Sequence, residues 1–336
     1  MACLGIVAML WHPALVASWP LREPAQLAQP ESLHPKVRHG GTTVDQLRQF
    51  MGNQSSHNSC LKLLKDHADE ILVLPERGLL WCPTAKAGTS TITNAIRRMI
   101  DPLADSLTMR RVYHVAERVR EGLKPGDQGR IVMANELTAV AQHKLCTSGR
   151  ALTFTTVRNP WERLVSGYLG KVAGGRDGGP NGGLEGVLNW LGMGIDEPVS
   201  FSKFVQFVAS QSDEAINNHY KPQSVRCGAG LNRYIIESRL ETSFEDDVKL
   251  MLRATGTSED FWSEDHISCT AHCLKSKFCI ANLEEQIGPK ATWEGNGTSE
   301  LARKLYEAHS EDKLADLVRQ RYKDDATLLG YTWHSG

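Results

Sequence analysis

The sequence predicts an α/β fold, a sandwich in which helices cover a central, largely parallel sheet. Apolar runs that suit buried strands alternate with amphipathic helical patterns along the 336 residues. Two of these runs each end in a polar turn that leads directly into a helix. The chain is 41% hydrophobic, which is ample for a core of one large domain or two small ones.

The N-terminal segment is expected to target the chain. Residues 3–19 are apolar and nearly free of charge, which is marginal for a membrane span of roughly 20 residues. His12 and Pro13 interrupt the run and no basic region precedes it, so it is an imperfect signal peptide as well. We expect residues 1–20 to be a signal-anchor or signal peptide. An N-terminal helix of a soluble protein is the alternative.

Residues 21–70 are expected to form a stem or linker. The stretch up to residue 45 contains Pro, Gln and His without any periodicity. Short helices are expected at 44–51 and 60–68. The catalytic domain is then expected to occupy residues 71–336.

The first strand–turn–helix unit opens this domain. Apolar runs at 71–74 and 79–82 are short and are bounded by Pro75 and Pro83. They predict one or two buried strands. From Ile92 onward, apolar residues recur at helical spacing, so a helix is expected there.

The turn between strand and helix has the chemistry of a phosphate-binding loop. Gly88 lets the backbone approach a ligand closely, and the N–H groups and dipole of the following helix attract an anion. Lys86 adds a mobile charge. The other candidate binding residues are Ala87, Thr89, Ser90 and Thr91. The loop is not a Walker A motif, because the lysine comes before the glycine. A Ser/Thr-capped helix with an incidental lysine is the alternative.

The second unit runs from a strand expected at 151–157 into a helix that starts near Pro160, a residue suited to a first helical turn. Arg158 stands at the end of the strand, and its fork of donors matches a phosphate. Ser166 follows about two helical turns later, so both side chains can reach one anion. A weak surface pair of Arg158 or Arg163 with Glu162 is the alternative.

Together these residues resemble the Golgi carbohydrate sulfotransferases, which use 3′-phosphoadenylyl sulfate (PAPS). Residues 86–91 look like the 5′-phosphosulfate loop of that family. Residues 157–168 are similar to its 3′-phosphate motif at nearly every position. Residues 218–223, with Cys227 following, and the tail at 321–331 resemble two further family segments.

The resemblance, which extends to chondroitin, dermatan and uronosyl 2-O-sulfotransferases, runs from about residue 71 to the C-terminus. It departs from the family pattern in extra residues between Pro83 and Lys86, and in Leu329, where Phe is usual. It implies a P-loop-kinase-like three-layer core. It also implies transfer of a sulfuryl group from PAPS to a hydroxyl acceptor, most often a carbohydrate. The loop, Arg158 and Ser166 would then bind the nucleotide.

Such a transfer needs positive charge at the leaving oxygen and a base for the hydroxyl proton. Lys86 suits the first task. His114 is the first candidate for the base, because it lies between the two phosphate motifs and distantly resembles a Gly-His-Val segment of uronosyl 2-O-sulfotransferases. His219 is the second candidate, and Glu136 and His143 are weaker ones. No metal is expected, because the donor sulfate is already activated.

Eight cysteines are present. Cys269, Cys273 and Cys279 would bind zinc in a cytosolic protein, but their spacing fits no common zinc finger. With a secretory leader, disulfides are favoured, and at least one pair is expected among these three and Cys227. We therefore expect a Golgi membrane protein with a luminal catalytic domain. A secreted protein is the alternative.

The expected partners follow from charge and chemistry. The formal net charge is −1, so no global field attracts nucleic acid and none is expected to bind. The expected partner is a glycan or another hydroxyl-bearing acceptor, with membrane contact only through the N-terminal segment. The alternatives are a small-molecule or tyrosine sulfotransferase, a kinase, or a non-catalytic luminal binding protein with this fold.

Further along the chain, amphipathic helices are expected at 201–211, 244–254 and 301–321. The glycine-rich stretch 174–183 is expected to be a mobile loop. It directly follows the second unit, which places it to overhang the acceptor site. A neutral surface insertion is the alternative.

Overall fold

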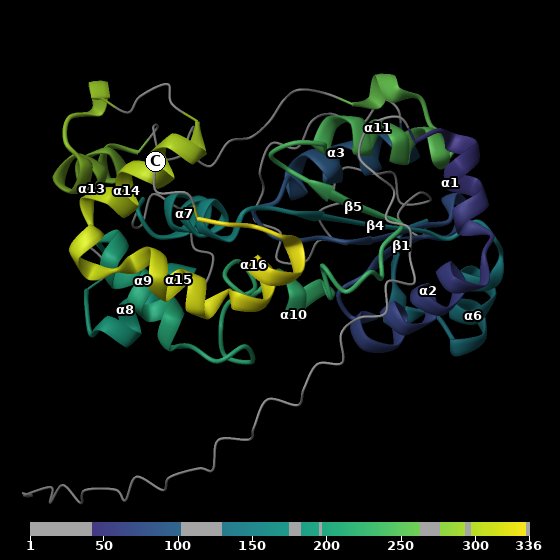
Figure 1. Ribbon diagram of the computed structural model, residues 1–336, viewed down its shortest axis with the longest axis horizontal. Coiled ribbons are helices and arrows are strands. Elements are labelled where there is room, and N and C mark those ends of the chain that lie inside the picture. Colours follow the sequence, from purple (N-terminus) through teal and green to yellow (C-terminus); the bar gives the residue numbers. More distant parts are fainter. Residues whose placement is uncertain are drawn as a thin grey trace, which may run out of the picture. The chain divides into compact units, whose positions relative to one another are not determined.

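The computed structural model describes residues 42–101, 130–174, 183–194, 197–262, 276–292 and 297–333. All of them lie in the compact unit that runs from His34 to Gly336. They form a five-stranded sheet and 13 α-helices (Figure 1). The N-terminal apolar segment, His114, most of the glycine-rich stretch, Cys269 and Cys273 lie outside the described residues.

The sheet is mixed, with strand order β3-β1-β2-β4-β5. The β2–β4 and β4–β5 pairings are parallel, and the β1–β2 and β1–β3 pairings are antiparallel. The prediction of a largely parallel sheet therefore holds only for the half formed by β2, β4 and β5. The strands are β1 (Leu72–Leu74), β2 (Leu79–Cys82), β3 (Val132–Met133), β4 (Leu152–Val157) and β5 (Ile236–Arg239).

A tight turn explains why β1 and β2 are antiparallel. The two strands are joined only by the 3₁₀ turn η1 (Pro75–Arg77) and Gly78, whereas a parallel pair needs a crossover of a dozen or more residues. Gly78 has a φ of 67°, and a Cβ there would lie 2.3 Å from the carbonyl oxygen of Arg150. The chain reverses at this point because glycine fits both the angle and the space.

Helices cover both faces of the sheet (Figure 1). Alternate strand residues such as Leu72, Leu79, Trp81 and Phe154 form one core with α1, α3 and α11. The intervening residues form a second core with α2, α6 and the end of α10. These helices are α1 (Val44–Met51), α2 (Gln54–His67), α3 (Thr89–Ile100), α6 (Ala139–Thr147), α10 (Gln223–Cys227) and α11 (Phe244–Ala254). The expected layering of helix, sheet and helix is present, and α1 and α2 take part in it.

A third apolar core surrounds α7 (Pro160–Lys171), the helix that follows β4. Its aromatic residues interlock: the ring of Tyr168 lies 5.3 Å from that of Phe201 and 5.4 Å from that of Phe204. The surrounding helices are α8 (Gly183–Leu191), α9 (Phe201–Ser210), α13 (Lys277–Ile287), α14 (Thr298–Ala308) and α15 (Leu314–Arg321). The last helix, α16 (Lys323–Leu329), brings Leu329 back against Val157 of β4.

The helix predictions agree with the structure except at two places. The helix expected at 60–68 begins earlier, because the Asn53 side chain accepts a hydrogen bond from the Ser56 N–H and caps α2 at Gln54. The helix expected at 301–321 is two helices, α14 and α15, with the short turn η6 (Ser310–Asp312) between them. Lys313, with a φ of 51°, breaks the periodicity there.

Two disulfides join described residues: Cys60–Cys146, which ties α2 to α6, and Cys82–Cys227, which ties β2 to α10. Cys227 is therefore not part of the pair expected among the C-terminal cysteines, because the fold places it against Cys82. Cys279 is disulfide-bonded as well, and its partner is none of these four cysteines. Across the described ranges, no helix is both long and apolar enough to cross a membrane.

Candidate active site

The loop after β2 folds back on Thr84. The Thr89 hydroxyl donates to the carbonyl oxygen of Thr84 at 2.6 Å, and the Ala87 N–H donates to the same oxygen at 3.2 Å. Lys86 adopts a φ of 69°, which costs a non-glycine residue of the order of 1–3 kcal/mol and is typical of functional sites. The Thr89 hydroxyl therefore holds the two ends of the loop together, and Lys86 occupies its strained, left-handed position.

Gly88 makes the junction between this loop and α3. Its φ is 80°, and a Cβ would lie 2.4 Å from the ring of Phe244, so only glycine fits. The helix starts at Thr89 with no side chain capping it. Helix geometry leaves the first N–H groups without intrahelical acceptors and gives that end a positive potential. The positive end of α3 therefore faces the loop, as the strand–turn–helix prediction requires, and anion binding there stays a prediction.

Arg158 joins the second unit to the first. It follows β4, is only 8% exposed, and donates through Nη1 to the carbonyl oxygen of Lys86 at 3.3 Å. Its Nη2 lies 3.5 Å from a carboxylate oxygen of Glu162, so the alternative pair does form, but both side chains are largely buried. The buried Nε has no acceptor among the described residues. A buried donor without an acceptor is uncommon, and this one is open to a bound group at the junction of the two units.

Ser166 lies on α7 as predicted and is 3% exposed. The N-terminal N–H groups of α7 are taken by the helix's own cap, because the Asn159 side chain accepts from the N–H groups of Trp161 and Glu162 at 3.0 and 3.5 Å. An anion at this unit would therefore depend on the side chains of Arg158 and Ser166 more than on the helix end.

Arg163, which the sequence analysis offers only as a surface partner of Glu162, is a buried residue of this site. It is 1% exposed, and it donates through Nε to the carbonyl oxygen of Ala85 and through Nη2 to that of Lys221, both at 2.9 Å. Burial lowers the pKa of this guanidinium from its ordinary value, and Arg158 lowers it further, while Tyr322 and Asp325 raise it. The phosphate loop, α7 and the segment before α10 are all fixed by this one side chain.

A buried network holds the backbone of Arg158. The Gln223 side chain accepts from the Arg158 N–H and donates to the Arg158 carbonyl oxygen, both at 2.9 Å. Asp325 of α16 in turn accepts from the N–H groups of Gln223 and Ser224 at 2.7 and 2.8 Å, and from the Ser224 hydroxyl at 2.6 Å. In the sequence, Gln223 and Asp325 stand out only as members of the segments 218–223 and 321–331, and only their burial identifies this role.

The Cys82–Cys227 disulfide lies at the base of the same site. Cys82 ends β2 directly before the phosphate loop, and Cys227 ends the helix that begins with Gln223. The Thr84 hydroxyl, in the loop itself, lies 3.7 Å from the Cys227 sulfur. Glu70, Cys82 and Cys227 lie close enough together to resemble a metal site. The two sulfurs are bonded to each other, however, and are not available to a metal.

His219 lies on the segment between α9 and α10, beside α7. Gly167, the neighbour of Ser166, allows this approach, because a Cβ there would lie 2.9 Å from the Tyr220 ring and 3.9 Å from the His219 carbonyl oxygen. The imidazole is half-buried, and its Nδ1 lies 2.7 Å from the Asn217 side-chain oxygen. That oxygen can only accept, so Nδ1 carries a proton. In the neutral ring the Nε2 atom is then the acceptor.

A comparison with protein families decides what kind of protein carries this site. The family model described as "Sulfotransferase family" matches residues 69–332. The chain belongs to the sulfotransferase family. No curated protein and no solved structure matches it.

The charges of the two strand–turn–helix units suit the reaction of a sulfotransferase. The reaction moves an anionic sulfuryl group, and Arg158 and Arg163 donate to the backbone carbonyl oxygens of Lys86 and Ala85 where the two units join. Arg158 and Arg163 are buried, and a buried cation stabilises an anionic group strongly because water does not screen it.

The remaining base candidates differ in their surroundings. Glu136, at the end of η2 (Ala134–Glu136), accepts from the Met133 N–H at 2.8 Å and serves as a local cap. His143 lies on the exposed side of α6. His114, the first candidate, falls outside the described residues and stays a prediction.

Proposed function

We propose that this protein transfers a sulfuryl group from PAPS to a hydroxyl group of a carbohydrate. The observation that carries the proposal is Arg158, a buried guanidinium that bridges the two phosphate units and keeps one donor, Nε, without an acceptor in the described part of the chain. The sulfotransferase family generally uses PAPS as its donor, and this nucleotide carries phosphate at two separate places.

The residues present fit that donor. In the proposal, residues 86–91 and the start of α3 bind the 5′-phosphosulfate. Arg158 and Ser166 bind the 3′-phosphate, with Arg158 providing forked donors and Ser166 a hydroxyl. In the proposal, Arg163 and Gln223 do not contact the donor. Arg163 holds the loop through Ala85, and Gln223 holds the strand end through Arg158.

The chemistry breaks the bond between sulfur and the phosphate oxygen and forms a bond between sulfur and the acceptor oxygen. Negative charge develops on the departing phosphate, and Lys86 at the crest of the loop is the cation proposed to stabilise it. The acceptor hydroxyl loses its proton to a base. The leaving product is 3′-phosphoadenosine 5′-phosphate.

For the base, we retain His114 and His219 as the two candidates. The contacts of His219 support its candidacy, since Asn217 holds the Nδ1 proton and leaves Nε2 as the basic atom. The segment also lies against Gly167, the neighbour of Ser166 in α7, and is tied to the loop through Arg163.

We also propose a luminal location in the Golgi, with a secreted protein as the alternative. The two disulfides between described residues and the disulfide-bonded Cys279 agree with an oxidising compartment. A small-molecule or tyrosine acceptor is the alternative to a glycan.

Calorimetry with two nucleotides tests the donor site. The protein should bind 3′-phosphoadenosine 5′-phosphate much more tightly than adenosine 5′-phosphate, because only the first has a group for Arg158 and Ser166. Equal affinities would overturn the proposal. A screen of glycans, tyrosine peptides and small alcohols with labelled PAPS then identifies the acceptor class, and transfer to none of them would favour a non-catalytic binding protein.

A further inference from the structure

The ion pair between Arg158 and Glu162 lies inside the proposed donor site. It joins one nitrogen, Nη2, to one carboxylate oxygen at 3.5 Å, and both side chains are largely buried. This is longer than the usual N–H···O hydrogen bond of about 2.7–3.2 Å. The carboxylate therefore balances the charge of Arg158 without occupying its fork of donors in the two-bond geometry of a matched pair.

The donors of Arg158 lie on different edges of the guanidinium group. Nη1 donates to the carbonyl oxygen of Lys86 at 3.3 Å, and the buried Nε has no acceptor among the described residues. Nε and Nη2 share one edge, which can donate two parallel hydrogen bonds to a phosphate. A phosphate on that edge needs Nη2, the nitrogen beside which the Glu162 carboxylate lies. The carboxylate must then either leave this nitrogen or stay beside the phosphate as a like charge.

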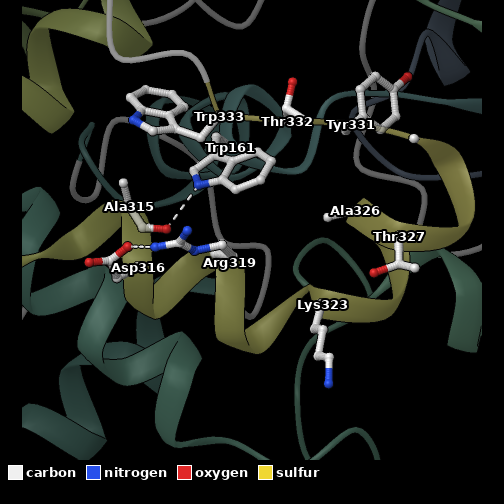
Figure 2. A pocket seen from close by; sticks show the side chains of 11 residues that line it. Trp161, Ala315, Asp316, Arg319, Lys323, Ala326, Thr327, Tyr331, Thr332 and Trp333 are labelled. Carbon is white, nitrogen blue, oxygen red and sulfur yellow. Dashed lines mark hydrogen bonds and ion pairs between the residues drawn. The ribbon is translucent and has the colours of Figure 1, made fainter.

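The backbone of Glu162 is held beside Arg158, because its two neighbours anchor the first turn of α7. On one side, Trp161 is 1% exposed, and its indole N–H donates to the Ala315 carbonyl oxygen at 3.0 Å (Figure 2). On the other side, Arg163 is held by its two bonds to distant carbonyl oxygens. Only rotation of the side chain is left to Glu162, so its charge stays near a phosphate bound to Arg158.

Without a ligand, Glu162 balances the charge of two buried cations. Arg158 and Arg163 are both buried. Burial lowers the pKa of Arg163, and the charge of Arg158 lowers it further, so the two guanidinium groups repel each other. A buried charge without a partner is costly. The carboxylate supplies that partner in the empty site, and it becomes an excess negative charge once a phosphate takes its place.

We propose that Glu162 stands in for the 3′-phosphate in the empty site and competes with it for Arg158, so that the product nucleotide leaves readily. Donor and product both carry the 3′-phosphate, and release of product limits turnover in many enzymes. Glu162 touches none of the reacting atoms and acts through Arg158, so it is a positioning residue. This inference rests on the proposed function, because it concerns the 3′-phosphate of the same donor.

Calorimetry of Glu162→Gln in the full chain, with 3′-phosphoadenosine 5′-phosphate as the ligand, tests this role. Glutamine keeps the shape and an oxygen that accepts from Nη2, and it removes only the charge. The variant should bind this nucleotide about tenfold more tightly, the scale on which one neighbouring charge alters an ionic equilibrium. Its affinity for adenosine 5′-phosphate should not change. Stopped-flow displacement should show that the gain comes from slower dissociation.

The matched control is Glu76→Gln, which also removes one negative charge. Glu76 lies in η1, at the other end of β2 from the phosphate loop, and pairs with Arg130 at 2.8 Å. This control should bind both nucleotides like the unaltered protein. If Glu162→Gln does not fold, Glu162→Asp replaces it. Aspartate keeps the charge in the first turn of α7 but shortens its reach toward Arg158, so a gain in affinity is again expected.

The proposal is overturned if the Glu162 variant binds 3′-phosphoadenosine 5′-phosphate no more tightly than the unaltered protein, because Glu162 would then support Arg158. A gain that comes only from faster association would also overturn it, since that reports the long-range field of the protein. If the unaltered protein prefers this nucleotide to adenosine 5′-phosphate and Glu162→Gln leaves the preference unchanged, the role of Glu162 is refuted and the donor stands. Equal affinities for the two nucleotides in both proteins refute the donor and the role of Glu162 together.

Discussion

The guanidinium of Arg158 donates to the carbonyl oxygen of Lys86 across 72 positions of sequence, at 3.3 Å. The end of one strand is thus attached to the phosphate loop that follows another. The two units that bind opposite ends of the proposed donor are therefore mechanically coupled, and substitutions in one should affect the other.

Arg158→Lys should weaken binding of 3′-phosphoadenosine 5′-phosphate more than Ser166→Ala does. Lysine keeps the charge but loses the fork that reaches both the ligand and the Lys86 carbonyl. Ser166→Ala removes one hydrogen bond and should cost about tenfold in affinity. Calorimetry checks both variants, with adenosine 5′-phosphate as the control ligand. A Ser166→Ala loss of equal size for both nucleotides would contradict the assignment of Ser166 to the 3′-phosphate.

Lys86→Gly and Lys86→Ala separate the roles of backbone and side chain. Glycine tolerates the φ of 69° and should leave the free energy of unfolding unchanged or raise it by about 1 kcal/mol, whereas alanine retains the strain. Both should lower the turnover number strongly, because both remove the ammonium group. Denaturant titration and steady-state kinetics check this pair. Retained turnover in either variant would show that Lys86 does not stabilise the leaving oxygen.

Asn217→Asp should shift the pH profile of the reaction if His219 is the base. A carboxylate at Nδ1 stabilises the protonated ring and raises the pKa of His219. The base then stays protonated to higher pH, so the acidic limb of kcat/KM should move to higher pH. His219→Ala should lower turnover by about 10²- to 10⁴-fold. Asn218→Ala, at the exposed neighbouring residue, is the control. An unmoved limb in Asn217→Asp would return the role to His114.

Removal of the Cys82–Cys227 disulfide should reduce both stability and nucleotide affinity, whereas removal of Cys60–Cys146 should reduce stability alone. The closed loops span 145 and 86 residues, so chain entropy predicts stability losses within about 0.5 kcal/mol of each other. Only the first bond lies beneath the phosphate loop. The double alanine variants, compared by denaturant titration and calorimetry, check this. Equal affinity losses in the two variants would contradict a local role for Cys82–Cys227.

Asp325→Ala should cost about 2–4 kcal/mol of unfolding free energy, because it leaves buried N–H groups of α10 without their acceptor. Nucleotide affinity should fall with it, since Gln223 would no longer hold the backbone of Arg158. Asp324→Ala, at the exposed neighbouring residue, provides the control for both measurements. If Asp325→Ala lowers stability but leaves affinity unchanged, the network is structural only.

The sequence by itself determined the two strand–turn–helix units and most of the helices. Local patterns are sufficient for these features: helical spacing places α11 at 244–254, and the short apolar run at 79–82, which Pro83 bounds, predicts a buried strand. The match of residues 157–168 to a known motif also predicts that Arg158 and Ser166 act together, and this stays a prediction. These predictions depend on neighbours in the chain, which the sequence displays directly.

Only the tertiary structure decided the sheet's mixed direction, the pairing of Cys227 with Cys82, and the roles of Arg163, Gln223 and Asp325. These features join residues far apart in sequence. An arginine that holds a loop 78 positions away has the same local pattern as one that forms a surface pair with its neighbour. The difference lies in burial, which removes water and makes each contact to a distant carbonyl or carboxylate necessary.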